Sequence, residues 1–368
     1  MSNRCQNYYS FDLNFEEKFA LCILHRKING GDLRFDHDLS FLHLTKYLYA
    51  MIIGVLLSVI TFAQHEPQFS QYMFSPIVFN PAFSGLEDAV VNVLDARSQW
   101  VDIPGAPQSQ TLSSHLPLYR INSGAGIRLV NDKTGQLQTT AVSLSYAYHV
   151  KVNKTTTLSI GVSGGMAYQS LDGSKLIAPQ GSYEGIIDHN DNYLPETLVS
   201  DIIPDLNSGI VLKTKKFELG ISALHLLGQA FEYPTSAGST SIQYSPTGYV
   251  YLSYLQKLGS NFHLRPTVLL KSDNIESMAD VNLLLDYKNN LILGASFRGY
   301  LANQTDAVII IAGWNISERL GINYSYDITL SGLSAVSQGS HELTIAYRIP
   351  VERPRAGKEI NNLRYLYY

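Results

Sequence analysis

The chain has 368 residues, of which 45% are hydrophobic and only 16% are charged, whereas globular domains average about 25% charged residues. A mean hydropathy of -0.02 excludes a bundle of membrane helices, and the formal net charge of -4 gives no reason to expect a nucleic-acid partner. The low charge and the 24 tyrosines fit a barrel with lipid outside and polar groups inside, although a pair of soluble β-sandwiches could show similar averages.

The N-terminal part has the pattern of an export leader. Lys46 opens a positive region, and residues 48–62 form an apolar run of signal-peptide length that ends at Ala63, which fits a cleavage point. We therefore predict a signal peptide region over residues 1–63, within which residues 1–45 have the character of an over-extended start. An uncleaved N-terminal anchor is the alternative.

Residues 64–88 are rich in aromatic side chains but show no periodicity. Pro76 and Pro81 argue against both a helix and a central strand. An apolar but irregular segment must be buried by another part of the protein. We expect it either to plug the barrel or to form an ordered lead-in to the first strand.

From residue 89 onward, apolar and polar residues alternate in segment after segment, which places them on opposite faces of strands. A transmembrane strand needs only about 9–11 residues. The sequence therefore predicts an all-β fold over residues 89–350: a transmembrane antiparallel up-and-down β-barrel of about 14 strands in the bacterial outer membrane. The predicted strands are 89–99, 107–118, 121–131, 139–150, 156–170, 205–214, 216–226, 246–257, 261–272, 278–288, 290–299, 305–314, 319–329 and 340–349.

The connections between these strands provide an independent test. If the first strand leaves the periplasm, odd-numbered connections should be extracellular and long, and even-numbered ones periplasmic and short. The even connections are short, and most odd ones are longer, including 131–138, 171–204 and 227–245, while 273–277 is a short exception. This alternation favours a membrane barrel and predicts a periplasmic C-terminus.

The last residues, 351–368, form a basic and aromatic tail beyond the final strand. We predict that this periplasmic C-terminal tail either docks a periplasmic partner or is a mobile solvated extension.

Eight short stretches, in order along nearly the whole mature chain, resemble the PorP/SprF family of outer-membrane proteins, which is tied to type IX secretion and gliding motility. They are PQFSQYMF at 67–74, NPAFSG at 80–85, RSQW at 97–100, GAPQ at 105–108, TLS at 111–113, VNDKTG at 130–135, SYAYH at 145–149 and YDITLS at 326–331. The tail after Pro350 departs from family members that stop at the last strand.

The resemblance implies a non-enzymatic barrel of the type IX secretion system that needs no cofactor. Such a protein helps to export or anchor a large secreted cell-surface adhesin and links to the periplasmic translocon. The implied partners are a secreted adhesin or other type IX substrate, periplasmic and outer-membrane translocon components, and membrane lipid. A diffusion channel or small-solute transporter is the alternative, and an unobstructed lumen lined by charged side chains would favour it. The inward-facing candidates are Asp286, Arg298, Asp327 and Arg348.

Partner-binding candidates come from the lead-in and from the first predicted extracellular loop. Trp100 and the proline-stiffened turn at 104–107 would make a rigid, amphipathic contact surface, unless this loop folds over the barrel mouth. The full set is Phe69, Tyr72, Phe74, Asn80, Pro81, Arg97, Trp100, Pro104, Gly105 and Pro107.

Two short patterns match catalytic or metal-binding motifs only in part. Residues 161–165 match G-x-S-x-G, but they lie inside a predicted strand, whereas a nucleophile elbow needs a strand, a sharp turn and a helix. A barrel hydrolase would therefore depend on Ser163. Asp188, Asn190 and Asn192 have calcium-loop spacing but lack the glycine and glutamate of an EF-hand, which leaves only a weak surface calcium site.

Cysteine usage narrows the chemistry further. The two cysteines, Cys5 and Cys22, precede the predicted cleavage point. The mature chain is therefore expected to have no disulfide, no thiolate catalysis and no cysteine-based metal site.

Overall fold

The computed structural model describes residues 66–184, 187–273, 276–300 and 304–352. The chain divides into two units, 1–58 and 59–368, and all described residues belong to the second. The predicted signal region and all but the first two residues of the predicted tail lie outside the described residues. Within the described part, no helix is long and apolar enough to cross a bilayer.

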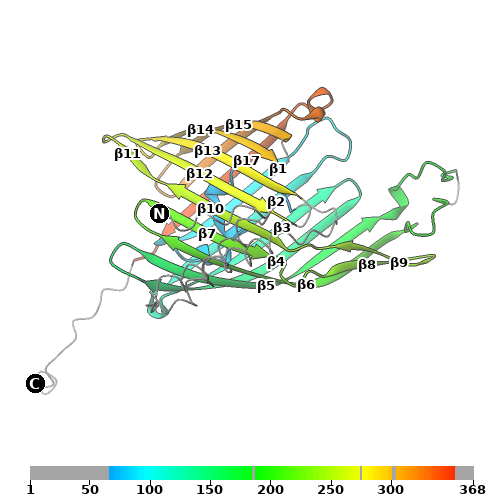
Figure 1. The fold of residues 1–368 in the computed structure, drawn as a ribbon, viewed down its shortest axis with the longest axis horizontal. Helices are drawn as coiled ribbons and strands as arrows, with labels where there is room; N and C mark the ends of the chain where they lie inside the picture. Colours follow the sequence, from blue (N-terminus) through cyan, green and yellow to red (C-terminus); the bar gives the residue numbers. More distant parts are fainter. Residues whose placement is uncertain (1–65, 185–186, 274–275, 301–303, 353–368) are drawn as a thin grey trace, which may run out of the picture. The chain divides into compact units, whose positions relative to one another are not determined.

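Fourteen antiparallel strands form a closed barrel (Figure 1). Consecutive barrel strands pair with each other, and the first pairs with the last through a register that runs from Ala89 opposite Pro350 to Ser98 opposite His341. The strands are β1 (Ala89–Ser98), β2 (Gln108–Leu118), β3 (Ser123–Thr134), β4 (Leu137–Lys151), β5 (Thr157–Asp172), β6 (Leu198–Lys213), β7 (Phe217–Leu224), β10 (Thr247–Tyr254), β12 (Phe262–Ser272), β13 (Ser277–Tyr287), β14 (Leu291–Tyr300), β15 (Gln304–Asn315), β16 (Leu320–Thr329) and β17 (Ser340–Pro350). The predicted fold class is thus confirmed.

The alternation that predicted the strands also determines which side chains face the lumen. In β16, Tyr324 and Ile328 are exposed on the outer face, while Ser325 and Asp327 are buried inside. Hydrocarbon surrounds the outer face, so apolar groups face outward and polar groups gather in the interior. Closure leaves no unpaired sheet edge in the lipid.

Two predicted connections are shorter in the structure. The 131–138 connection is only a turn at 135–136, because β3 and β4 continue on either side of it. The 171–204 connection shrinks to 173–197, because β6 begins at Leu198. Pro204 is tolerated inside β6 because the β6–β7 register covers only Ser208–Lys213, so the missing N–H would have had no β7 partner.

The connection predicted at 227–245 contains a separate hairpin, β8 (Ala230–Thr235) and β9 (Gly238–Gln243), which pair only with each other among the described strands. A further short strand, β11 (Gln256–Leu258), extends the pairing of β12. Neither changes the count of barrel strands. The hairpin arises because residues 230–243 carry their own alternation around a turn.

The two ends of the barrel differ. The short-turn end carries the connections 119–122, 152–156, 214–216, 255–261, 288–290 and 316–319. The opposite, long-loop end carries 99–107, 173–197, 225–246 and 330–339, together with the short turns 135–136 and 273–276. The barrel begins with β1 and finishes with β17 at the short-turn end.

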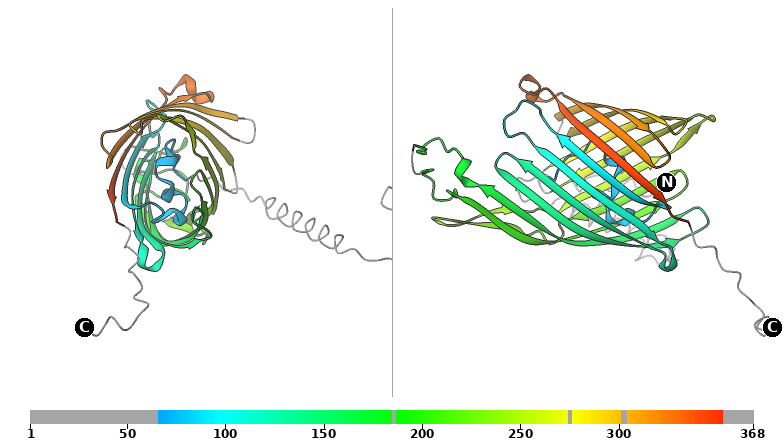
Figure 2. Two further views of the ribbon diagram at one scale, coloured as in Figure 1. Left: turned by 90° about the vertical axis from the view of Figure 1, so that its left-hand side faces the viewer. Right: turned by 180° about the vertical axis from the view of Figure 1, so that it is seen from behind.

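The lead-in, residues 66–88, lies inside the barrel, where Figure 2 shows it in blue within the ring of strands. It forms three short 3-10 helices, η1 (Tyr72–Phe74), η2 (Pro76–Val78) and η3 (Pro81–Phe83). Pro76 and Pro81 open η2 and η3, where their missing N–H groups cost no hydrogen bond. The prolines that exclude a long helix thus form tight turns that fit the lumen.

Candidate functional site: the filled lumen

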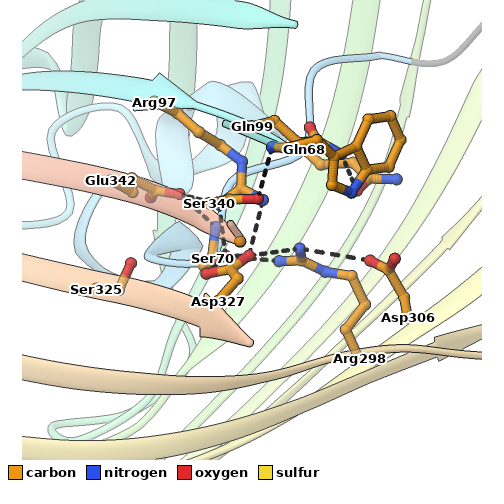
Figure 3. A network of polar contacts seen from close by, with 12 residues as sticks. Gln68, Ser70, Arg97, Gln99, Arg298, Asp306, Ser325, Asp327, Ser340 and Glu342 are labelled. Atoms are coloured by element: carbon orange, nitrogen blue, oxygen red, sulfur yellow. Dashed lines mark hydrogen bonds and ion pairs between the residues drawn. The ribbon is translucent and has the colours of Figure 1, made fainter. Parts of the chain in front are cut away.

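The lumen holds a cluster of buried charged side chains, which we call the lumen ion network (Figure 3). It joins the lead-in to six strands of the wall. Its members are Ser70, Arg97, Asp280, Arg298, Asp306, Asp327 and Glu342.

Ser70 lies between the two guanidinium groups of this network. Its Oγ accepts hydrogen bonds from Arg97 Nη1 at 2.8 Å and from Arg298 Nη2 at 2.9 Å, and it donates to Asp327 Oδ2 at 2.7 Å. Asp327 Oδ2 also contacts Arg97 Nη2 at 2.7 Å and Arg298 Nη1 at 3.1 Å. One hydroxyl of the lead-in therefore uses its donor and both of its acceptor positions.

Glu342 fixes the backbone of the lead-in at the seam where the barrel closes. It lies opposite Arg97 across the β1–β17 pairing and contacts it at 3.1 Å. Its two carboxylate oxygens accept the N–H groups of Ser70 at 2.7 Å and of Gln71 at 2.9 Å. The Gln71 side chain in turn donates to the Glu342 carbonyl at 3.0 Å. The lead-in is thus bound to the first and last strands together.

Arg298 connects the remaining carboxylates. Its Nε lies 3.0 Å from Asp280 Oδ1, and its Nη1 lies 3.8 Å from Asp306. The network therefore sets two guanidinium groups against four carboxyl groups, and none of these side chains is more than slightly exposed. Removing one partner of a buried ion pair costs about 3–5 kcal/mol, so the lead-in is fixed by contacts that few other arrangements could satisfy.

Further along, aromatic side chains of the lead-in pack against β10. The Tyr251 ring has its centroid 6.3 Å from that of Tyr72, 5.5 Å from that of Phe79 and 5.7 Å from that of Phe83. Phe79 also lies 5.8 Å from Tyr249. These distances are typical of favourable aromatic pairs. These rings form a small apolar cluster inside a lumen whose wall is mostly polar.

The irregular backbone of the lead-in is satisfied by polar side chains of the wall. Arg128 Nη1 donates to the Val78 carbonyl at 2.6 Å, and the carbonyls of Phe79 and Ala82 accept from serine hydroxyls of β7 and β5, each at 2.6 Å. The Asn80 side chain donates to two wall carbonyls at 3.3 Å and accepts from the Ala82 N–H at 2.9 Å. Buried backbone groups need such partners, which explains why serines line the interior.

Glycines let the lead-in approach the wall closely. A Cβ added at Gly161 would lie 2.5 Å from Ala82 Cα and 2.6 Å from the Pro81 carbonyl carbon, so no other residue fits there without moving the lead-in. Gly124 is pressed against Gly85 in the same way. The G-x-S-x-G pattern at 161–165 is therefore part of a packing surface, and Ser163 accepts a hydrogen bond from the Asn207 amide at 3.0 Å.

The beginning of the lead-in is held near the long-loop end by a group that we call the latch: Glu66, Asp205, His225 and Lys271. His225 lies between the carboxylates of Glu66 and Asp205, with Nδ1 2.9 Å from Asp205 Oδ1. Lys271 Nζ donates to the Glu66 carbonyl at 2.7 Å. Burial would lower the pKa of His225, but the two carboxylates raise it overall. Burial would raise the pKa of Glu66, but His225, Arg128 and Lys271 lower it to about 2.

At the long-loop end, the β8–β9 hairpin packs against the inner faces of β5 and β6. Phe231 and Tyr233 are fully buried there beside Ile203 and Ala167, and the Tyr233 hydroxyl donates to Gln169 Oε1 at 2.7 Å. Two other loops of this end carry large exposed apolar side chains. They are Ile177, Tyr193 and Val336, with exposed fractions of 83%, 64% and 62%.

The structure separates the ten predicted partner-binding residues into two groups. Tyr72, Asn80, Pro81 and Arg97 are buried in the lumen, and Phe69 and Phe74 are half-buried there, so these six side chains contact the barrel itself. Their position corresponds to the plug alternative of the sequence analysis, and binding of a partner by these six residues stays a prediction. The other four form the 99–107 loop, where Pro104 and Gly105 are exposed while Trp100 and Pro107 are half-buried.

The predicted calcium-loop residues lie in the 173–197 connection. Asp188 Oδ1 accepts the Asn190 N–H at 2.8 Å, and the Asn192 carbonyl accepts the Ala237 N–H at 3.1 Å. The first contact organises a turn in the loop, and the second joins the loop to the turn of the β8–β9 hairpin. Among the described residues, no group of three or more histidine, cysteine, aspartate and glutamate side chains is placed to hold a metal ion.

Several residues of the site were not predicted from the sequence. Ser70 lies between the predicted partner-binding residues Phe69 and Tyr72 but was not itself predicted. Asp280, Asp306 and Glu342 occupy inward positions of predicted strands. Their signal was a charged residue on the lumen face of a strand, which becomes informative only when opposite charges on distant strands are placed together.

A family model described as Type IX secretion system membrane protein PorP/SprF matches residues 61–347. No curated protein matches the chain. Solved structures with a similar fold include the toluene transporter TbuX of Ralstonia pickettii, which is 10% identical with a TM-score of 0.44 over 75% of this chain and 93% of that chain. Another is the outer membrane protein Omp33 of Acinetobacter baumannii, which is 9% identical with a TM-score of 0.41 over 71% of this chain and 99% of that chain.

Proposed function

Because the chain belongs to the PorP/SprF family of type IX secretion system membrane proteins, we propose that it is a non-enzymatic outer-membrane scaffold that helps to export or anchor a large secreted adhesin. The barrel holds the adhesin, or another type IX substrate, at its long-loop end. Its short-turn end meets the translocon.

The occupation of the lumen by the lead-in is the observation that carries this proposal. The lead-in spans the interior from the latch to the start of β1, and the lumen ion network fixes its first residues in the long-loop half of the barrel. A chain that devotes this many buried contacts to closing its interior is suited to holding other proteins at its two ends rather than to passing solute.

Outer-membrane barrels have short periplasmic turns and longer extracellular loops. By that rule the long-loop end faces outward, and both the start of β1 and the end of β17 are periplasmic. The exposed apolar side chains Ile177, Tyr193 and Val336 then project from the cell surface. Exposed large apolar groups on otherwise polar loops are typical of protein-binding surfaces, and the adjacent 99–107 loop extends the same surface with Trp100 and Pro104.

The test replaces Ile177 and Tyr193 with serine in the otherwise complete protein. We expect the adhesin to be lost from the cell surface, as measured by antibody labelling of intact cells, while outer-membrane fractions contain the normal amount of barrel. Ile316→Ser is the matched control, because Ile316 is an exposed apolar residue of a turn at the short-turn end. Normal adhesin display by the double variant would overturn the proposal.

A diffusion channel remains the second candidate function because four inward charges line the interior as predicted: Asp286, Arg298, Asp327 and Arg348. The position of the lead-in inside the lumen argues against a diffusion channel. Planar-bilayer recordings of the purified protein decide between the two, since a scaffold with a filled lumen gives little conductance and a channel gives that of an open pore.

A further inference from the structure

We propose that the short-turn end carries a binding site for an acidic, extended segment of a periplasmic protein. The site is a cavity of about 380 Å³, which we call the vestibule. Its size lies within the range of about 300–1,000 Å³ that is usual for ligand-binding pockets. The inference rests on the proposed function, because that function places the translocon at this end.

The vestibule exists because the lead-in fills only part of the lumen. Residues 77–85 lie against the β2–β7 side of the wall, where Ile77 approaches Gly126 and Ala82 approaches Gly161. The side from β12 to β17 is left open towards the short turns. Phe74 of the lead-in and the buried wall residues Leu284 and Ile292 line its apolar part.

Positive charge predominates in the vestibule. Lys257 and Arg265 line it, and their side chains form no hydrogen bond or ion pair with the described residues. Arg348 lines it as well and contacts Glu87 at 3.2 Å, with His263 nearby on the wall. Since two cations lack a partner inside the protein, the vestibule attracts anionic groups.

Acidic groups of the wall do not cancel this charge. Asp286 is the acidic residue of the lining, and its Oδ1 accepts the backbone N–H of Asn289 at 2.7 Å. Glu218, on neighbouring β7, is paired with Lys213 at 2.8 Å. Carboxylates brought in by a ligand would therefore find Lys257 and Arg265, whose side chains are paired with no carboxylate of the described residues.

The polar lining favours a peptide over a small anion. Asn289, Asn315 and Asn323 bring amide groups to the cavity, and amides can pair with both N–H and C=O groups of an extended chain. Asn323 is buried, and its Oδ1 has no hydrogen-bond partner in the structure. A buried amide oxygen without a partner is costly, and a backbone N–H donor in the cavity would relieve that cost. The lead-in occupies the lumen beside these residues, with Phe74 in the cavity lining, which favours a ligand that is held there over one that passes through.

The experiment measures binding of a dye-labelled seven-residue peptide of alternating glutamate and valine to the full-length protein in lipid nanodiscs, by fluorescence anisotropy. We expect binding to the unmodified protein, and an affinity about tenfold or more lower for Lys257→Glu/Arg265→Glu, because two reversals turn two attractions into repulsions. The matched control is Arg120→Glu/Lys154→Glu, which makes the same charge change on exposed turns of the same end. Circular dichroism verifies that both variants are folded.

Three results would overturn the proposal: no peptide binding, equal loss in both double variants, or displacement of the peptide by phosphate or acetate at concentrations no higher than that of the peptide. The last result would assign the vestibule to small anions. Adhesin display separates this proposal from the function on which it rests. If the Ile177 and Tyr193 variant keeps its adhesin while the peptide still binds, the scaffold function is wrong and the vestibule proposal stands. If that variant loses its adhesin and the peptide does not bind, only the vestibule proposal is wrong.

Discussion

The two halves of the lead-in are held in the lumen by different forces. Residues 66–71 are held by ion pairs and charge-assisted hydrogen bonds, from the latch to the lumen ion network. Residues 76–85 are held by close packing, through aromatic rings on β10 and glycines on β3 and β5. Both halves are buried. Ionised side chains hold mainly the first half, although Arg128 also donates to the Val78 carbonyl in the second.

The two halves of the lead-in therefore contribute differently to its position in the lumen. The packing contacts do not depend on pH or salt, so they keep the second half of the lead-in in place next to β1 when the charge of the first half changes. Buried ion pairs contribute specificity more reliably than stability, so the first half determines which position the lead-in adopts. Changes to the ionic half should therefore be costly when they leave a buried charge alone, and changes to the packed half should displace the segment physically.

The largest effect is expected for Arg298→Met. Without the guanidinium, Asp280 loses its arginine partner and Asp327 keeps only Arg97. Leaving a buried charge unpaired costs about 3–5 kcal/mol, which urea unfolding of the barrel in lipid vesicles measures through tryptophan fluorescence. Arg348→Met is the control: the Arg348–Glu87 pair is about one-third exposed, and exposed pairs contribute about 0–1 kcal/mol. If both variants lose the same free energy of unfolding, the lumen ion network contributes no more than a partly exposed ion pair.

Gly161→Val tests the packed half. The new side chain would occupy the space of the Pro81–Ala82 backbone, so we expect overpacking to cost about 1–3 kcal/mol and the lead-in to shift. A shifted lead-in opens the lumen, and planar-bilayer conductance should rise. Gly164→Val is a matched control three residues along the same strand, where an added Cβ meets nothing within 4 Å. Unchanged conductance in Gly161→Val would argue that the lead-in is not what closes the barrel.

The sequence predicted the strands of the barrel better than the contacts of the lead-in inside it, for a physical reason. Strand alternation is local, so Tyr324 and Asp327 reveal their opposite faces within a few residues. The start of β6 was missed because Pro204 interrupts the local pattern, and its tolerance depends on where the neighbouring strand ends. The contact between Ser70 and Glu342 joins residues 272 positions apart. No local pattern encodes such a pair, although the motif around Ser70 and the lumen-facing position of Glu342 were each visible.

The smallest effect concerns the latch and is a dependence on pH. The His225 pKa is raised in the folded protein, so its contribution is fully present below about 6.5, the ordinary value for histidine, and is lost as the pH rises through the raised pKa. The Glu66 pKa is lowered to about 2, so its contribution is lost only as the pH falls towards that value. The latch should therefore be strongest in mildly acidic solution and weaken in alkaline solution.

Access to the start of the lead-in measures this weakening. With Cys5 and Cys22 replaced by serine, a cysteine at Gln68 reports exposure through its rate of maleimide labelling. We expect this rate to increase between mildly acidic and alkaline pH by more than the ordinary ionisation of a thiol explains. The same cysteine in a His225→Gln background provides that reference, because glutamine preserves a polar contact but cannot become charged. If both backgrounds give the same pH profile, His225 does not control the latch, and the ionic half of the lead-in is held by the lumen ion network alone.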